Sequence, residues 1–179
     1  KFEAAAFENQ DHVQFRGTVF ENEGTLRFGS FSQRGKDPAQ FTNAGNVVFS
    51  DAHFECGDNV DFPAVGFSCD GEVNFDETRF TGDGSVNFGA RHETIAAEFT
   101  NGGAVSFVDA RFRDLDGVYF NHVGFERDEP IQFDGVTFDD VGQFSLADVR
   151  LCDPGQVSFT GSDLTGVTLD FVPSGMEFR

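Results

Sequence analysis

The chain has 179 residues and a formal net charge of −19, with 12 Lys and Arg residues against 31 Asp and Glu residues. No segment approaches about eighteen consecutive apolar residues, so the sequence predicts no membrane segment in this chain, and no basic-then-apolar leader is visible. The 25 Phe residues stand beside 1 Tyr and no Trp, which indicates a repeated structural role for Phe.

Along the chain, Phe recurs at spacings that alternate between five and eight residues. The pattern is plainest from Val47 to Phe88 and predicts one inward residue per unit. Near the C-terminal end it continues through Phe159, Leu164 and Leu169. The structural core is expected at Phe49, Phe54, Phe62, Phe67, Phe75, Phe80, Phe107, Phe112, Phe120, Phe125, Phe133 and Phe138.

A second apolar residue stands two positions before most of these, as in Val60-Asp61-Phe62 and Val73-Asn74-Phe75. A spacing of two places both side chains on the same side of an extended segment. Each unit is therefore predicted to be a very short strand with one buried face. The spacings do not fit the stripe of a helix, and a sandwich or barrel needs longer strands. A fixed short period with the same inward residue favours a solenoid.

These units resemble the pentapeptide-repeat family. Ser162-Asp-Leu164 and Val167-Thr-Leu169 match its five-residue pattern without gaps, and Ala52-His-Phe54 and Ala110-Arg-Phe112 match its Ala-x-Phe form. The remaining units differ from the five-residue repeat of that family, because every second corner has three extra residues. The resemblance implies an all-β fold, a right-handed quadrilateral parallel β-helix. We expect a single solenoid domain over residues 1–179, with about six to seven coils of about 26 residues each, and we interpret the chain as a piece of a longer protein.

The cysteines test the number of sides. Cys56 and Cys69 stand thirteen residues apart at matching places in the repeat. A thirteen-residue coil would make them vertical neighbours able to form a disulfide, whereas a four-sided coil places them at opposite corners. The four-sided interpretation therefore predicts that Cys56, Cys69 and Cys152 are free. Their spacing matches no zinc motif, so no metal or other cofactor is expected.

Two insertions, residues 29–38 and 89–96, interrupt the repeat after corresponding units. With four strands per coil both leave the same edge of the rod, with His122 one coil further on. Arg34, Lys36, Arg91 and His92 make these insertions basic on an acidic chain. Because inserted loops often carry function, the candidate interaction edge comprises Arg34, Lys36, Arg91, His92 and His122. The alternative is neutral drift of surface loops.

The acidity has two candidate explanations. A salt-rich cytoplasm favours surface carboxylates over lysines and points to a halophilic archaeon. Mimicry of nucleic acid is the other explanation, because members of the pentapeptide-repeat family that protect or inhibit DNA gyrase are acidic rods shaped like a duplex. The acidic residues are spread along the whole chain rather than gathered in one block, which favours adaptation to salt.

No P-loop, GxSxG or HExxH motif is present, so no catalytic residues are assigned and the chain is not expected to be an enzyme. The sequence predicts a non-enzymatic repeat scaffold or protein-interaction domain of a halophilic, cytoplasmic protein. Its expected partner is an unidentified protein, with self-association through the coil ends as a further expectation and no direct nucleic-acid binding. The alternative is a DNA mimic that binds gyrase or another DNA-binding protein. A pectinase-like enzyme is a third hypothesis, but its coils are longer and three-sided.

Overall fold

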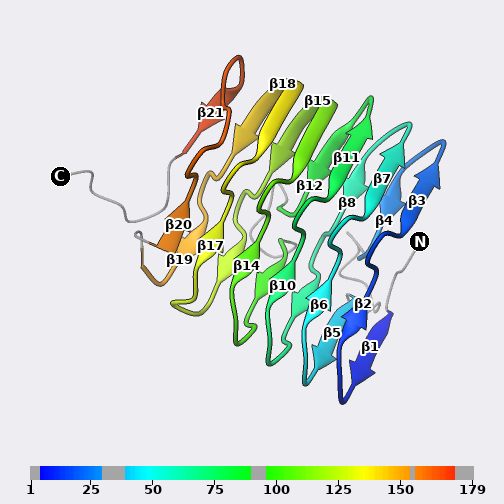
Figure 1. Ribbon diagram of the computed structural model, residues 1–179, viewed down its shortest axis with the longest axis vertical. Helices are drawn as coiled ribbons and strands as arrows, with labels where there is room; N and C mark the ends of the chain where they lie inside the picture. The colour runs from blue at the N-terminus through cyan, green and yellow to red at the C-terminus, as the bar shows by residue number, and fades with distance from the viewer. Residues whose placement is uncertain (1–4, 30–38, 90–95, 154–155, 172–179) are drawn as a thin grey trace.

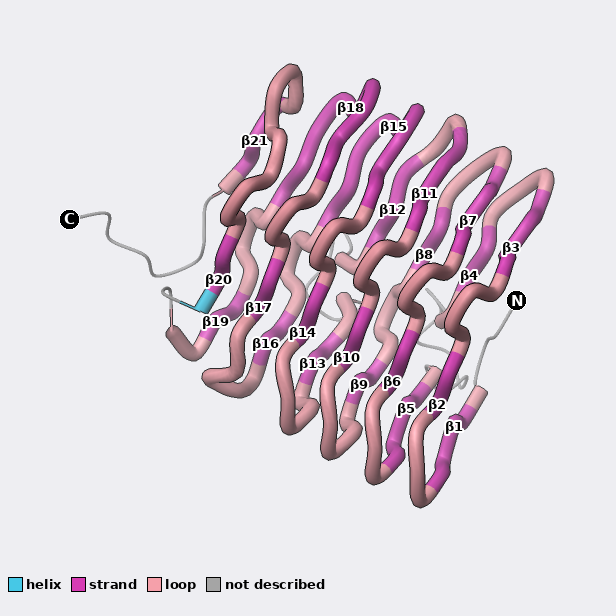
Figure 2. Tube along the Cα trace, viewed as in Figure 1, coloured by secondary structure: helices cyan, strands magenta, loops and turns pink. Residues whose placement is uncertain are grey.

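The computed structural model describes residues 5–29, 39–89, 96–153 and 156–171. The chain winds as a right-handed coil, and each strand pairs in parallel with the corresponding strand of the next coil (Figure 1). Most strands are short and separated by turns, as Figure 2 shows. No helix in the described ranges is long and apolar enough to cross a membrane. The fold is all-β: a four-sided parallel β-helix.

The first two sides of the rod are six-stranded parallel sheets. Face 1 contains β1 (Ala6–Asn9), β5 (Gln40–Asn43), β9 (Gly66–Phe67), β13 (Glu98–Phe99), β16 (Gly124–Phe125) and β19 (Arg150–Leu151). Face 2 contains β2 (Val13–Gln14), β6 (Val47–Val48), β10 (Val73–Asn74), β14 (Val105–Ser106), β17 (Ile131–Gln132) and β20 (Val157–Ser158).

The other two sides are joined into one sheet, because two nine-residue strands continue around the corner between them. Face 3 contains β3 (Val19–Asn22), β7 (His53–Cys56), β11 (Arg79–Gly82) and the first residues of β15 (Arg111–Tyr119) and β18 (Thr137–Ser145). Face 4 contains β4 (Leu26–Arg27), β8 (Val60–Asp61), β12 (Ser85–Asn87), the last residues of β15 and β18, and β21 (Thr168–Asp170).

The register settles the number of sides. Phe54 pairs with Phe80, and Cys56 pairs with Gly82 rather than with Cys69. Neighbouring coils are thus offset by 26 residues, as between Asp61 and Asn87. The offset rises to 34 residues across the first insertion and to 32 across the second. The four-sided coil is confirmed, and Cys56, Cys69 and Cys152 are free thiols.

The core is built from ladders of stacked Phe rings. On face 2, Phe75 stacks on Phe49 at 4.7 Å and on Phe107 at 4.8 Å between ring centroids, with interplanar angles of 1° and 3°. Phe62 and Phe88 reach into the same core from face 4 and meet Phe75 edge-on. Rings thus stack along the axis and meet edge to face across it, both favourable aromatic arrangements.

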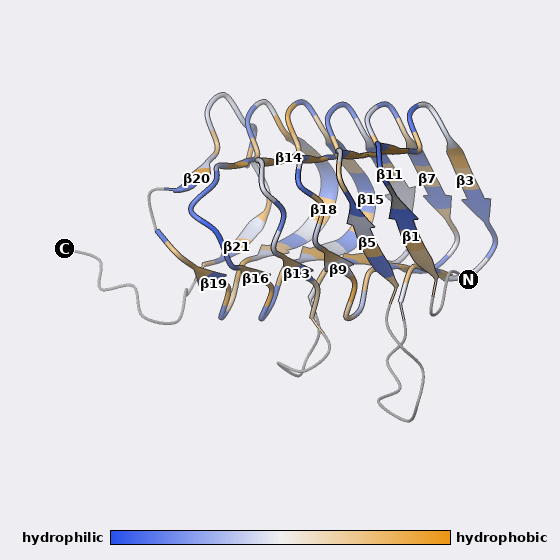
Figure 3. Ribbon diagram, turned by 90° about the horizontal axis from the view of Figure 1, so that it is seen from below, coloured by the Kyte–Doolittle hydropathy of each residue, from blue (hydrophilic) through white to orange (hydrophobic). Residues whose placement is uncertain are grey.

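Each of the twelve Phe residues assigned to the core is buried, with between 0% and 8% of its surface exposed. Figure 3 shows strongly hydrophobic residues along the strands of faces 1 and 2. Phe144 belongs to the core as well, 2% exposed, although the five–eight spacing does not mark it. It pairs with Val118, so it fills the position two residues before the inward Leu146.

The last coil corrects one sequence assignment. The five-residue spacing predicts Leu169 as the inward residue, but Leu169 is 52% exposed and pairs with Phe144. Leu146 donates its N–H to the Asp170 carbonyl, which places Phe171 in the inward position, packed against the core. The corner that follows Leu164 is therefore wide, whereas the five-residue step from Leu164 to Leu169 indicates a tight one.

The wide corner between faces 1 and 2 is closed from inside by side-chain amides. Asn43 Nδ2 donates to the carbonyl oxygens of Asp11 and Asn46, each at 3.1 Å. Asn101 Nδ2 donates to the Gly103 carbonyl oxygen at 2.6 Å. Cys69 occupies the equivalent place in the intervening coil. Its Sγ lies 3.5 Å from the Gly71 carbonyl oxygen and 3.8 Å from that of Glu72. Burial raises the pKa of the Cys69 thiol to about 11, so it remains protonated near neutral pH.

Replacing Cys69 with Asn is expected to raise the free energy of unfolding by about 1 kcal/mol, because an amide would replace a weak thiol donor at buried carbonyl groups. Cys69→Val, which removes the donor, is the matched control and should lower stability. Urea unfolding followed by circular dichroism measures both variants. Equal stability of the two variants would contradict this account of the corner.

Candidate interaction face

The outer surface of face 3 carries the candidate site. In each strand the central Phe points inward, so the residues on both sides of it point outward. The parallel register stacks the outward residues of successive coils into columns. The first column is His53, Arg79, Arg111 and Thr137; the second column is Glu55, Thr81, Arg113 and Asp139.

A third set of side chains borders the first column at the tight corner that precedes face 3. Glu77 and Asp109 occupy this corner, and both have a positive φ of 56°. Gly135, with φ of 66°, follows in the next coil. This left-handed backbone turns the chain sharply and leaves the two carboxylates exposed beside the first column.

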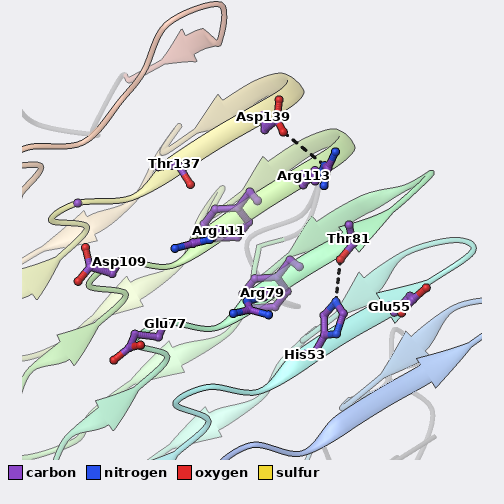
Figure 4. Close-up of a pocket in the computed structure, with 13 residues that line it drawn as sticks. His53, Glu55, Glu77, Arg79, Thr81, Asp109, Arg111, Arg113, Thr137 and Asp139 are labelled. Carbon is purple, nitrogen blue, oxygen red and sulfur yellow. Dashed lines mark hydrogen bonds and ion pairs between the residues drawn. The ribbon is translucent and has the colours of Figure 1, made fainter.

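The three sets line a groove of about 1060 Å³ that runs across several coils. Figure 4 shows its side chains coming from β7, β11, β15 and β18 and from the corners before them. Phe80 and Phe112 also line it. Since the floor is the Phe-ladder sheet, the coil geometry fixes the Cα positions from which the outward side chains extend.

Three positively charged side chains lie in the groove with different local partners. Arg113 Nε is 3.4 Å from Asp114 Oδ2 and 3.4 Å from Asp139 Oδ2. Arg79 and Arg111 are exposed and make no side-chain hydrogen bond or ion pair with any residue in the described ranges. Figure 4 shows these two side chains side by side, with their guanidinium ends on the side of Glu77 and Asp109. We call Arg79 and Arg111 the arginine pair.

His53 forms the next position of the first column. Its Nε2 lies 3.1 Å from Thr81 Oγ1, within hydrogen-bonding distance. This contact links two neighbouring coils on the outer surface and orients the imidazole toward the second column. The column thus runs from an imidazole through two guanidinium groups to the hydroxyl of Thr137.

The edge predicted from the insertions is a different part of the rod. Arg34, Lys36, Arg91 and His92 lie outside the described residues. The residues that begin the two insertions are Gly29 and Gly89, and they follow Phe28 and Phe88 at the same corner of their coils. Both insertions therefore begin at the tight corner between faces 4 and 1, diagonally opposite the corner of Glu77 and Asp109.

His122 lies at that insertion corner, with a positive φ of 61°. It is partly buried, and its Nδ1 is 3.9 Å from Asp148 Oδ2. Its carbonyl oxygen accepts a hydrogen bond of 3.1 Å from Arg150 Nη1. These contacts tie the corner to the next coil, so a structural role accounts for His122, and its membership of an interaction edge stays a prediction.

The groove was not identified from the sequence, although a signal for it was present. Arg79 and Arg111 each stand between two inward residues, in Thr78-Arg79-Phe80 and Ala110-Arg111-Phe112. Comparing outward residues at the coil period, with the second insertion allowed for, would have placed them in one column.

Comparisons with known proteins add little. No family model matches the chain, and no curated protein matches it. Among solved structures, a trypsin-treated variant of QnrB1, a plasmid-mediated fluoroquinolone resistance protein, is 14% identical over 92% of each chain, with a TM-score of 0.14. A likeness this low carries no argument about function. No three His, Cys, Asp or Glu side chains of the described ranges come together as a metal site.

Proposed function

We propose that this chain is a non-enzymatic repeat scaffold, a protein-interaction domain whose contact surface is the groove on face 3. The observation that carries the proposal is the stacking of outward side chains into ordered columns on a core of stacked Phe rings. A face of this kind presents side chains from a regular backbone, so the backbone pays little conformational cost on binding.

We further propose that the chain is a Phe-rich variant of the pentapeptide-repeat solenoid from a halophilic archaeon, acting in the cytoplasm. Its alternating five- and eight-residue steps support the family assignment. The net charge of −19 supports a salt-adapted surface, because such a charge keeps a protein soluble through self-repulsion.

The groove argues against the DNA-mimic alternative for this face. A mimic of duplex DNA needs a continuous negative surface, with one charge per about 1.7 Å of axis. On face 3, Arg79, Arg111 and Arg113 interrupt the carboxylates over two successive coils. A supercoiling assay with DNA gyrase at matched salt tests the alternative directly, and inhibition at stoichiometric concentrations would favour it over the proposal.

A photo-crosslinking amino acid at Thr137, an exposed residue of the groove, tests the proposed function. The same amino acid at Ser68, exposed at the end of face 1, is the matched control. In extracts of the source organism, we expect a discrete protein adduct from Thr137 that excess unlabelled chain suppresses, and none from Ser68. Absence of an adduct from Thr137, or equal adducts from both positions, would overturn the proposal for this face.

A further inference from the structure

The arginine pair is the one place in the described ranges where the strand register pairs two arginines. Arg79 and Arg111 are direct partners in the register of β11 and β15, so their backbones lie about 4.8 Å apart and two like charges occupy adjacent coils. Like charges directly opposite each other in a sheet are destabilising. The chain has only 12 Lys and Arg residues, yet Arg79 and Arg111 lie directly beside each other.

The other arginines in the described ranges are engaged within the molecule. They form hydrogen bonds or ion pairs: Arg16 with Ser50, Arg27 with Asp61, Arg113 with Asp139, Arg127 with the Thr100 carbonyl, and Arg150 with Glu98. The arginine pair alone among them lacks such a partner in those ranges. An external anion would neutralise the repulsion and replace water as the acceptor of charge-assisted hydrogen bonds from both guanidinium groups.

The groove indicates what kind of anion fits. Glu77 and Asp109 border the arginine pair at the corner, and Glu55 and Asp139 lie in the second column one coil before and one coil after it, with Thr81 and Arg113 between them. A nucleic-acid strand, with a phosphate at every nucleotide, would run its charges past these carboxylates. A protein segment that alternates acidic and neutral residues would place charge only over the guanidinium groups. Its acidic side chains would recur at about 7 Å on one side, within reach of two flexible arginine side chains.

We propose that Arg79 and Arg111 bind the side-chain carboxylates of an acidic protein segment that lies along the rod axis in the face 3 groove. Each planar guanidinium presents donors that match a carboxylate bidentately. The groove, at about 1060 Å³ and extending from His53 to Asp139, exceeds what two carboxylates alone would fill, so it accommodates the backbone of the segment. This inference rests on the proposed function and names the class of its partner.

The probe for the test is a fluorescent peptide that alternates Glu and Gly, with a peptide that alternates Gln and Gly as its uncharged counterpart. We expect the acidic peptide to bind at low ionic strength and to weaken as salt screens the charges. Arginine Nε resonances of Arg79 and Arg111 should shift in an NMR titration. The double variant R79Q/R111Q should bind roughly tenfold more weakly or worse, since two charge-assisted contacts are lost.

The variant R127Q/R150Q is the matched control, because it removes the same number of positive charges from face 1. It should bind the acidic peptide nearly as tightly as the unaltered chain. Equal losses in both double variants, or no binding by the unaltered chain, would overturn the inference. Tighter binding of an oligo-dT strand that depends on the arginine pair would overturn it in favour of a nucleic acid. A partner crosslinked at Thr137 while the peptide fails to bind would leave the proposed function standing without this assignment.

Discussion

Replacing Phe75 with Ala is expected to lower the free energy of unfolding by about 3–5 kcal/mol. Phe75 has no exposed surface and stacks on Phe49 and Phe107 at 4.7 Å and 4.8 Å. The cavity cannot close easily, because the backbone register of the coils above and below holds the neighbouring rings apart. Denaturant unfolding followed by circular dichroism measures the loss.

The control is Phe159→Ala on the same face. Phe159 stacks on Phe133 at 5.1 Å and is only partly buried in the last described coil. Phe159→Ala should lower the free energy of unfolding by roughly half as much as Phe75→Ala, because Phe159 buries less apolar surface in the folded chain. Equal costs would mean that the ladder does not behave as a stack of nearest-neighbour contacts.

The sequence predicts this core well because its signal is periodic and redundant. Every coil repeats the same inward positions, so neighbouring units correct a wrong assignment of an inward residue in any one unit. The two insertions change only the residue offset between coils. Where redundancy ends, the prediction fails. Leu169 has no following coil in the described ranges to fix its register, and its five-residue distance from Leu164 matched the repeat by coincidence.

The candidate site was harder to predict because it depends on outward residues, which the core does not constrain. A single Arg between two inward residues carries no information about a site, and Arg79 and Arg111 are separated along the chain by the second insertion. Only their direct pairing between β11 and β15 makes them neighbours. The lack of an internal partner within the described ranges is a property of three-dimensional arrangement that no spacing reveals.

Face 4 contains an ion pair with a buried carboxylate, between Arg27 and Asp61. Asp61 points outward from β8 but is only 2% exposed. Its Oδ2 lies 3.0 Å from Arg27 Nη2 in the preceding coil, and its Oδ1 accepts a 2.9 Å hydrogen bond from Asn87 in the next. One carboxylate thus connects three coils, with a cation on one side and an amide on the other.

Replacing Asp61 with Ala is expected to destabilise the fold by about 3 kcal/mol, because Arg27 and Asn87 would both lose their contact with a buried carboxylate. Asp58→Ala is the control, since Asp58 is exposed and accepts one hydrogen bond, from Thr25, at 2.8 Å. It should cost less than about 1 kcal/mol. Urea unfolding of each variant provides the comparison.

A double-mutant cycle separates the ion pair from simple loss of packing. If the cost of Asp61→Ala arises mainly from loss of its ion pair with Arg27, then adding Arg27→Ala should cost little more, giving a coupling energy of about 1–2 kcal/mol. Fully additive losses would assign the effect to packing instead.

The arginine pair on face 3 differs from Arg27, because within the described ranges neither Arg79 nor Arg111 has an internal acceptor such as Asp61. Truncating Arg79 or Arg111 should therefore leave stability within about 0.5 kcal/mol of the unaltered chain, so that a loss of binding there reports on the contact surface rather than on folding.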